Sequence, residues 1–268
     1  DLTVGALSNR LVCHIEGGEL SGTVDDLIRH SISKLSHIHM VANDEAKRRL
    51  IQMGEDESRI YVIGSPDLDV MKSHELPSLE SVREHYGLPD TDYAIAMFHP
   101  VTSEEQDMAA HAKSFFEALK ASGDNYIVIY PNNDAGSSSI LDVIEENRKH
   151  PHFFTFPSLR FEAFLVLLKN AKYIIGNSSA GIREAPFYGV PSVNVGTRQN
   201  RRFKGTSVIN VGYSTSEVLA GIDAAKAMGR CEPSEWFGSG DSVTRFADAL
   251  NSPEFWATEY QKPFVDRS

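Results

Sequence analysis

Short apolar runs alternate with helical patterns along the whole chain. The runs are rich in β-branched and aromatic residues, whereas the segments between them repeat their apolar positions every three to four residues. This alternation is typical of a parallel sheet covered by helices, so we predict an α/β protein. Strands are predicted at 10–15, 38–43, 60–64, 93–98, 126–130, 153–156, 172–176, 192–195 and 208–211.

The predicted strands fall into two groups, three before and six after the polar stretch 72–80. Six strands with interleaved helices make a complete doubly wound domain, whereas three make half of one. We therefore expect two Rossmann-like domains, a truncated one at 1–72 and a complete one at 73–240, with helices in 241–268 packing across both. The pattern at 2–7 indicates the end of a helix, so the chain is expected to start in mid-domain. Helices are predicted at 24–36, 44–53, 243–250 and 253–260.

Composition excludes several classes of protein. The 268 residues are 41% hydrophobic and 24% charged, and no apolar run approaches the roughly 20 residues that span a bilayer. A formal charge of -11, with the 26 basic residues dispersed, argues against nucleic acid as a partner. The two cysteines form no CxxC pair, which indicates a reducing compartment, and we expect the cytoplasm.

Polar residues follow the first predicted strand, at the edge where a parallel sheet binds its ligands. Glycines in the segment 14–19 allow a sharp turn, and Glu16 and Asp25 can both be aimed into one cleft. Paired acids suit proton transfer. The alternative is that Asp25 and Asp26 complement the helix dipole after a Thr23 cap, and that Glu16 is a solvated loop acid.

Histidines occur at two other strand positions. His99 directly follows an apolar strand and precedes Pro100, which forces the chain to turn, so it is a candidate for binding phosphate or moving a proton. A purely structural, hydrogen-bonded histidine is the alternative. His37 and His39 share one face of a strand, but no third ligand has suitable spacing. We therefore predict no metal site.

The strongest signal is the segment 174–185, which runs from a buried strand into a predicted helix with a small, hydroxylated first turn. Free N–H groups at such a start, with Ser178 and Ser179 beside them, suit a diphosphate. Glu184 lies farther along the helix and can accept two hydroxyl hydrogens of a ribose. The same residues fit an ordinary serine cap with a surface glutamate. Neither the GxGxxG nor the P-loop pattern is present.

Two further loops after strands have the composition of binding loops. The segment 130–137 is rich in turn-forming residues, which alone is a weak signal. Three arginines follow the strand at 192–195, and the guanidinium of Arg198 is a candidate for contacting a diphosphate. For Arg201 and Arg202 a solvated basic loop is an equal alternative.

Taken together, these segments resemble successive motifs of the hydrolysing UDP-N-acetylglucosamine 2-epimerases of sialic acid biosynthesis. The motifs occur in the family's order and cover nearly the whole chain. They are HIEGGE at 14–19, SGTVDDLIRH at 21–30, FHPVT at 98–102, PNNDAG at 131–136, GNSSAGIREA at 176–185 and GTRQ at 196–199.

The resemblance implies a GT-B-like fold, in which two doubly wound domains face each other across a cleft and UDP lies on the second. The implied reaction removes the C2 proton of UDP-N-acetylglucosamine and expels UDP, giving a 2-acetamidoglucal. Water then adds at C1 while C2 is reprotonated on the opposite face, and the products are N-acetylmannosamine and UDP. No cofactor is needed, and a homo-oligomer, dimer or tetramer, is expected.

The resemblance also implies roles for single residues. Acid/base roles fall on Glu16, Asp25 and His99. Nucleotide contacts fall on Asn132, Ser178, Ser179, Glu184 and Arg198, with Ser158 and Leu159 near uracil. Family members begin with a further strand, a GTRADFGK-like loop and a GDR segment, so we expect roughly one hundred residues to be missing and these 268 alone to bind UDP weakly without turnover. Alternatives are a UDP-sugar glycosyltransferase and a non-catalytic UDP-sugar-binding protein.

Overall fold

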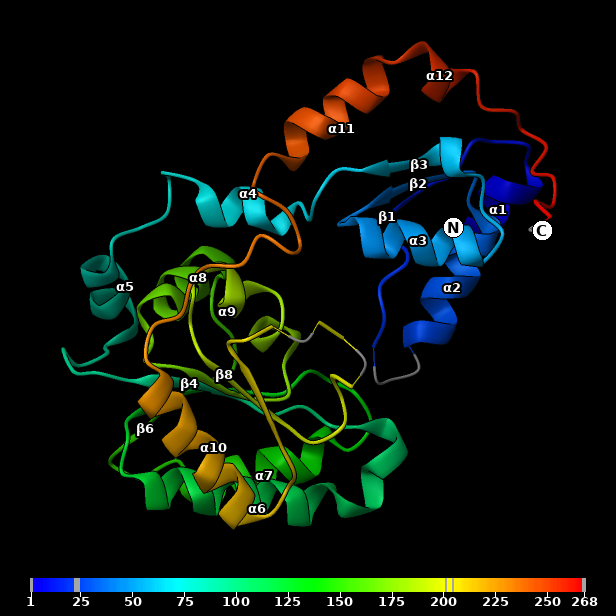
Figure 1. The fold of residues 1–268 in the computed structure, drawn as a ribbon. Coiled ribbons are helices and arrows are strands. Elements are labelled where there is room, and N and C mark those ends of the chain that lie inside the picture. The colour runs from blue at the N-terminus through cyan, green and yellow to red at the C-terminus, as the bar shows by residue number, and fades with distance from the viewer. Residues whose placement is uncertain (1, 22–24, 201, 204, 267–268) are drawn as a thin grey trace. The chain divides into compact units, whose positions relative to one another are not determined.

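The chain forms two compact units, each built on its own parallel sheet (Figure 1). The computed structural model describes residues 2–21, 25–200, 202–203 and 205–266. The first unit combines Asp1–His74 with Glu235–Ser268, and the second is the continuous segment Glu75–Ser234.

The first unit contains a three-stranded parallel sheet in the order β1-β2-β3. Its strands are β1 (Cys13–Ile15), β2 (Ile38–Val41) and β3 (Ile60–Val62). Its helices are α1 (Leu2–Leu7), α2 (Asp25–Leu35), α3 (Asp44–Gln52), α4 (Asp67–Lys72), α11 (Ser242–Asn251) and α12 (Pro253–Trp256), with a 3₁₀ turn η1 (Glu57–Arg59). All three predicted strands are confirmed. The predicted start of α2 at Val24, and the Thr23 cap, lie outside the described residues.

Apolar side chains cover both faces of this sheet. On one face Met40 packs with Ala249 and Phe255 from the C-terminal helices, and on the other Val41 packs with Leu50 of α3. The segment 235–240, which the sequence pattern placed with the second domain, belongs to this unit. The predicted packing of the C-terminal helices across both domains stays a prediction.

The predicted helix at 253–260 is too long, because α12 ends at Trp256. The residues that follow are tied to distant parts of the first unit by hydrogen bonds. His37 Nε2 donates to the backbone oxygen of Tyr260 (3.0 Å), since Nδ1 already accepts from the Val12 N–H. Lys262 Nζ donates to backbone oxygens at the end of α2, those of Ser33, Lys34 and Ser36 (3.1, 3.0 and 2.6 Å).

Glu55 is the buried carboxylate that forms an ion pair with Lys262 of this C-terminal segment. Only 1% of its side chain is exposed, and its carboxylate lies 2.5 Å from Lys262 Nζ, 2.7 Å from Lys34 Nζ and 2.9 Å from His39 Nε2. Burial raises the pKa of the Glu55 carboxyl, but hydrogen bonds from these three partners outweigh burial and lower the pKa from 4.5 to about 2. His37 and His39 thus have structural partners, the reading that the sequence favoured.

The second unit is a complete doubly wound sheet of six parallel strands in the order β6-β5-β4-β7-β8-β9. Its strands are β4 (Ala94–Met97), β5 (Tyr126–Ile129), β6 (Phe153–Phe156), β7 (Ile174–Gly176), β8 (Ser192–Val195) and β9 (Val208–Val211). Its helices are α5 (Leu79–Tyr86), α6 (Met108–Ser122), α7 (Ser137–Asn147), α8 (Phe161–Asn170), α9 (Glu184–Phe187) and α10 (Thr215–Met228), with 3₁₀ turns η2 (Thr102–Asp107) and η3 (Ser179–Gly181). The six predicted strands are confirmed, and the order reverses between β4 and β7, which is where such sheets bind ligands.

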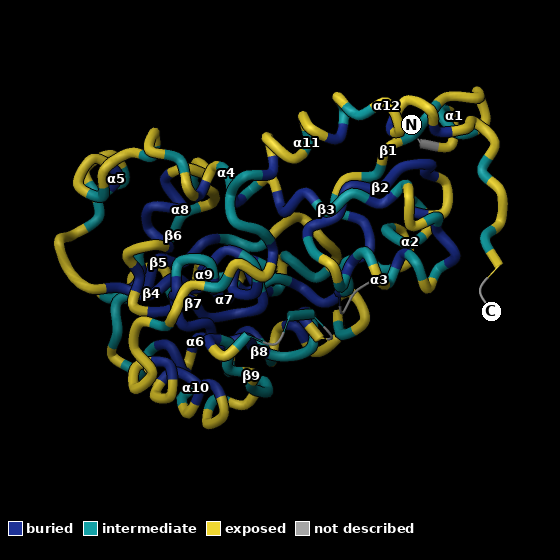
Figure 2. Tube along the Cα trace, turned by 45° about the horizontal axis from the view of Figure 1, so that its top comes forward, coloured by how far each residue is buried: buried dark blue, intermediate teal, exposed yellow. Residues whose placement is uncertain are grey.

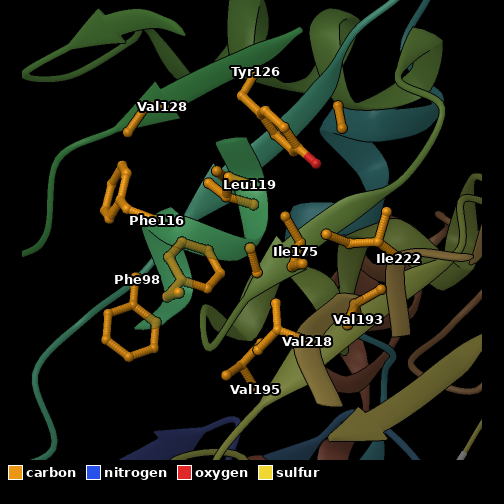
Figure 3. Packing of buried hydrophobic residues seen from close by; sticks show 14 of the residues in the cluster. Phe98, Phe116, Leu119, Tyr126, Val128, Ile175, Val193, Val195, Val218 and Ile222 are labelled. Carbon is orange, nitrogen blue, oxygen red and sulfur yellow. The ribbon is translucent and has the colours of Figure 1, made fainter. Parts of the chain in front are cut away.

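Helices cover both faces of this second sheet, with α6, α7 and α10 on one face and α8 and α9 on the other (Figure 1). In Figure 2 the central strands are buried, whereas the helices around them alternate between buried and exposed residues. Figure 3 shows Leu119 of α6 and Ile222 of α10 near Ile175 of β7, and Phe116 of α6 near Val128 of β5. Because burying each such side chain contributes about 1.5–3 kcal/mol, this core fixes the strand ends that carry the polar residues.

Candidate functional site

The carboxyl end of β7 is drawn tightly against the end of β4. Gly176 has φ +130°, a backbone conformation that residues with a side chain rarely adopt, and a Cβ there would lie 1.9 Å from the backbone oxygen of Met97. The next residue, Asn177, donates its backbone N–H to that same oxygen (3.0 Å). Glycine at 176 therefore lets the two strand ends meet at the point where the strand order reverses.

Asn177 connects three segments at this edge. Its side-chain Oδ1 accepts from the backbone N–H of His99 (2.6 Å), and its Nδ2 donates to the backbone oxygen of His99 (2.8 Å). Its backbone oxygen accepts from Arg198 Nη1 (3.2 Å) and Gln199 Nε2 (2.8 Å). The predicted site residues His99 and Arg198 are thus brought together by a residue to which the sequence assigned no role. The available signal was an asparagine directly after a buried strand.

The ring of His99 is held in one tautomer. Its Nδ1 accepts from the backbone N–H of Asn132 (3.2 Å), so the neutral ring carries its proton on Nε2. Burial, followed by the positive charge of Arg198, lowers the pKa of His99 to about 4. At neutral pH the side chain therefore offers an uncharged Nε2–H donor. Of the two roles that the sequence left open, phosphate binding suits this state better than proton transfer, and the acid/base role stays a prediction.

The helix predicted to start at Ser178 is interrupted. Residues 179–181 form the 3₁₀ turn η3, capped by Ser178, whose Oγ accepts from the Ala180 N–H (3.3 Å). The four-residue α9 begins only at Glu184, which is 9% exposed and so is not a surface residue. Pro186 explains the break, because it has no N–H to donate to residue 182 in a continuous helix. The expected long helix dipole is absent from this described segment, and the local donors are the backbone and hydroxyl groups of the turn.

Arg198 stands on a loop that side chains from other segments hold in place. Glu104 accepts hydrogen bonds from the Thr197 hydroxyl and from the Tyr213 hydroxyl, the latter at 2.6 Å. Burial, together with the hydrogen bond to Glu104 and its charge, raises the pKa of Tyr213 to about 12, so the phenol remains a donor at neutral pH. The guanidinium of Arg198 is thereby placed beside the end of β7.

The other predicted contacts of the second unit lie at neighbouring strand ends. Asn132 follows β5, and its side chain donates to Asp134. Ser158 is exposed and Leu159 half-buried after β6, the edge strand of the sheet. Of the two remaining arginines, Arg202 is half-buried, whereas Arg201 lies outside the described residues.

In the first unit, Glu16 is a fixed acid rather than a solvated one. Its backbone has φ +63°, its N–H donates to the oxygen of Met40 (2.7 Å), and the carboxylate accepts from Ser65 Oγ (2.6 Å). Ser65 is 2% exposed and follows β3. The ends of β1 and β3 thus hold the Glu16 carboxylate in a defined position.

The two acids at the start of α2 have different surroundings. Asp25 is exposed. Asp26 accepts from the backbone N–H and hydroxyl of Ser21 (2.6 and 3.1 Å) and from Arg29 (3.2 Å), so it stabilises the turn before the helix. Asp25 is therefore the more exposed acid of this pair.

The described residues contain neither a cluster of metal ligands nor a membrane-spanning helix. No group of three histidine, cysteine or acidic side chains could hold a metal ion there. None of the helices within the described ranges combines the length and the hydropathy needed to cross a membrane.

Comparison with known proteins agrees with the sequence motifs. The family model described as UDP-N-acetylglucosamine 2-epimerase matches residues 3–251. A UDP-N-acetylglucosamine 2-epimerase of Neisseria meningitidis serogroup B is 58% identical over 266 residues, which are 98% of this chain and 70% of that protein. A UDP-N,N'-diacetylbacillosamine 2-epimerase (hydrolyzing) of Legionella pneumophila is 37% identical, over 90% of this chain and 64% of that protein.

The fold is shared with solved structures. The crystal structure of the Methanocaldococcus jannaschii UDP-GlcNAc 2-epimerase in complex with UDP-GlcNAc and UDP superposes with a TM-score of 0.76 at 17% identity, covering 93% of this chain and 71% of that one. This likeness supports the expected GT-B-like class. With its GT-B-like fold and its match over most of its length, the chain belongs to the UDP-N-acetylglucosamine 2-epimerase family.

Proposed function

We propose that this chain acts in the hydrolysing 2-epimerisation of UDP-N-acetylglucosamine, giving N-acetylmannosamine and UDP for sialic acid biosynthesis. The observation that carries the proposal is the assembly around Asn177, which places the His99 donor and the Arg198 guanidinium together at the switch point of a nucleotide-binding sheet. The names of the relatives support both the substrate and the hydrolysing type.

The second unit would bind the nucleotide. Arg198 supplies a permanent positive charge, His99 an uncharged Nε2–H, and the turn at Ser178 and Ser179 further N–H and hydroxyl groups. A diphosphate held by such donors is stabilised as negative charge builds on it when the C1–O bond breaks. Glu184 would accept from the ribose hydroxyls, and the exposed loop at Ser158 and Leu159 would contact uracil.

The first unit would supply proton transfer. A carboxylate of Glu16, oriented by Ser65, is suited to exchanging a proton with C2 of the sugar, and Asp25 is the second candidate acid. Removal of that proton and departure of UDP leave a C1–C2 double bond. Water then adds its hydroxyl at C1, and a proton returns to C2 on the opposite face. The chemistry requires no cofactor.

Turnover of an intact enzyme in deuterated water tests this function. The proposed reaction places deuterium at C2 of the N-acetylmannosamine and releases UDP. A glycosyltransferase would leave C2 unlabelled, and a non-catalytic binding protein would return the substrate unchanged, so either result would overturn the proposal.

The homo-oligomer and the cytoplasmic location stay predictions. The cytoplasmic location accords with Cys13 and Cys231 being free thiols.

Ser178→Ala and Glu184→Ala are expected to weaken UDP binding, each by about 1–3 kcal/mol, because each would remove a hydrogen bond that the bound nucleotide buries. Titration calorimetry with UDP measures the change. Ser122→Ala is a matched control, since the Ser122 hydroxyl bonds Leu119 and Tyr126 away from the carboxyl edge of the sheet. Unchanged affinity in both site variants would show that the UDP pocket lies elsewhere.

A further inference from the structure

We infer that Asn177 is a positioning residue, which sets the distance between the His99 donor and the Arg198 guanidinium and so shapes the site for the diphosphate. The inference rests on the proposed function and deepens it. Asn177 is 0% exposed, so it acts through its neighbours rather than by touching the nucleotide.

Where β4 and β7 separate, the side chain of Asn177 continues the hydrogen bonding that the backbone groups of the two strands make up to that point. The last ladder pair is Met97 with Gly176, and the N–H of Asn177 still bonds the Met97 oxygen. One residue farther along, the asparagine amide bonds both the N–H and the oxygen of His99. A primary amide has the same donor and acceptor as a peptide group, so it can pair with a strand end while its own backbone turns away.

The backbone of Asn177 holds the other side of the site. Because the backbone turns away from β4 at Asn177, the carbonyl oxygen of Asn177 points to the β8 loop and accepts hydrogen bonds from Arg198 and Gln199. The side chain therefore fixes the β4 loop and the backbone fixes the β8 loop. A change of the side chain should move His99 while leaving the oxygen that holds Arg198 in place, so the spacing between the two phosphate-binding groups is expected to change.

Asparagine is the side chain that this geometry requires. An aspartate has nearly the same shape and can still accept from the His99 N–H, but its second oxygen would face the His99 carbonyl oxygen and repel it. It would also place a negative charge next to the proposed diphosphate. A serine can form only one of the two bonds. The two substitutions therefore remove different parts of the contact.

The test compares Asn177→Asp and Asn177→Ser with Asn194→Asp. Asn194 is also buried (3% exposed), lies on neighbouring β8, and donates to Asn210 (2.8 Å), so its substitution probes the general cost of a buried carboxylate. We expect roughly tenfold or weaker UDP binding for Asn177→Asp, a smaller loss for Asn177→Ser, and unchanged UDP binding for Asn194→Asp. Thermal unfolding of all three reports their stability separately.

Nitrogen NMR of the His99 ring supplies a readout that a merely structural role would not change. In the wild-type chain UDP should shift the Nε2 signal, and in Asn177→Asp this response should shrink, whereas in Asn194→Asp it should persist. UDP affinities of the Asn177 variants within twofold of wild type would overturn the inference. An equal loss of affinity in Asn194→Asp at a similar loss of stability would also overturn it, as would failure of both Asn177 variants to fold.

Failure of the proposed reaction gives a different result from failure of this inference. If an intact enzyme binds UDP but places no deuterium at C2, the epimerase proposal fails, while the calorimetric comparison of the Asn177 variants still decides the positioning role. If deuterium is incorporated and the Asn177 variants bind UDP normally, the positioning role fails alone.

Discussion

In an intact enzyme, Glu16→Gln is expected to lower turnover by roughly two orders of magnitude or more, while UDP affinity changes little. Glutamine has the shape of glutamate and can still accept from Ser65, but it cannot take up the C2 proton. Because the nucleotide contacts proposed here lie in the second unit, binding should be almost unaffected. Coupled detection of UDP and N-acetylmannosamine gives the turnover, and calorimetry gives the affinity.

Glu19→Gln is the matched control, since it makes the same change in the same loop, at a residue with no proposed role in proton transfer. We expect turnover near that of the wild type. Asp25→Asn tests the second candidate acid and is expected to show a loss similar to that of Glu16→Gln. A Glu16 variant with near-normal turnover would remove this residue from the mechanism and leave Asp25 as the acid candidate of the first unit.

Glu55→Gln is expected to lower the free energy of unfolding by about 3 kcal/mol at pH 7, because it leaves Lys262 and Lys34 beside a neutral partner in a buried site. Chemical denaturation measures the change. Glu57→Gln is the control two residues away. Its carboxylate is 63% exposed and forms an ion pair with Lys47, so its loss should change the free energy by less than about 1 kcal/mol.

The contribution of Glu55 to the free energy of unfolding should decrease as the pH is lowered. Its pKa is about 2 in the folded chain and near 4.5 when unfolded, so the unfolded chain binds the proton first as the pH falls. The contribution is therefore complete above about pH 4.5 and is lost progressively toward pH 2. Free energies of unfolding of the wild type and Glu55→Gln should converge over that interval. A constant difference would contradict the assigned charge state.

The strands could be predicted from the sequence because a strand of a parallel sheet is buried on both faces and is therefore apolar throughout. The apolar segment 126–130 needed no other information, and β5 (Tyr126–Ile129) lies within it. The predicted bounds 192–195 and 208–211 match those of β8 and β9, although each of these strands also contains an asparagine. The errors arose where distant residues decide the conformation. The chain leaves the helix after Trp256 to place Lys262 beside Glu55, more than two hundred residues earlier in the sequence.

The candidate site was predicted residue by residue only through the resemblance to a family. Local pattern placed His99 and Ser178 after strands, but it could not show that β4 and β7 are neighbours, because two other strands lie between them in the sequence. The contact between Asn177 and His99 depends on that order. The bond between Ser65 and Glu16 depends likewise on the sheet of the first unit. Such contacts depend on which strands are neighbours in the sheet, and this order cannot be inferred from a short segment of the sequence.

The division of the first unit between the two ends of the chain bears on the order of events during synthesis. Residues 75–234 emerge from the ribosome as one uninterrupted segment, so the second unit can fold while translation continues. Residues 1–74 appear earlier but must wait for 235–268, which bring the apolar face of α11 and the ammonium group that neutralises Glu55. Until residues 235–268 are synthesised, Met40 and its apolar neighbours lack their contacts with the C-terminal helices. At that stage the nascent chain is most exposed to chaperones and to aggregation.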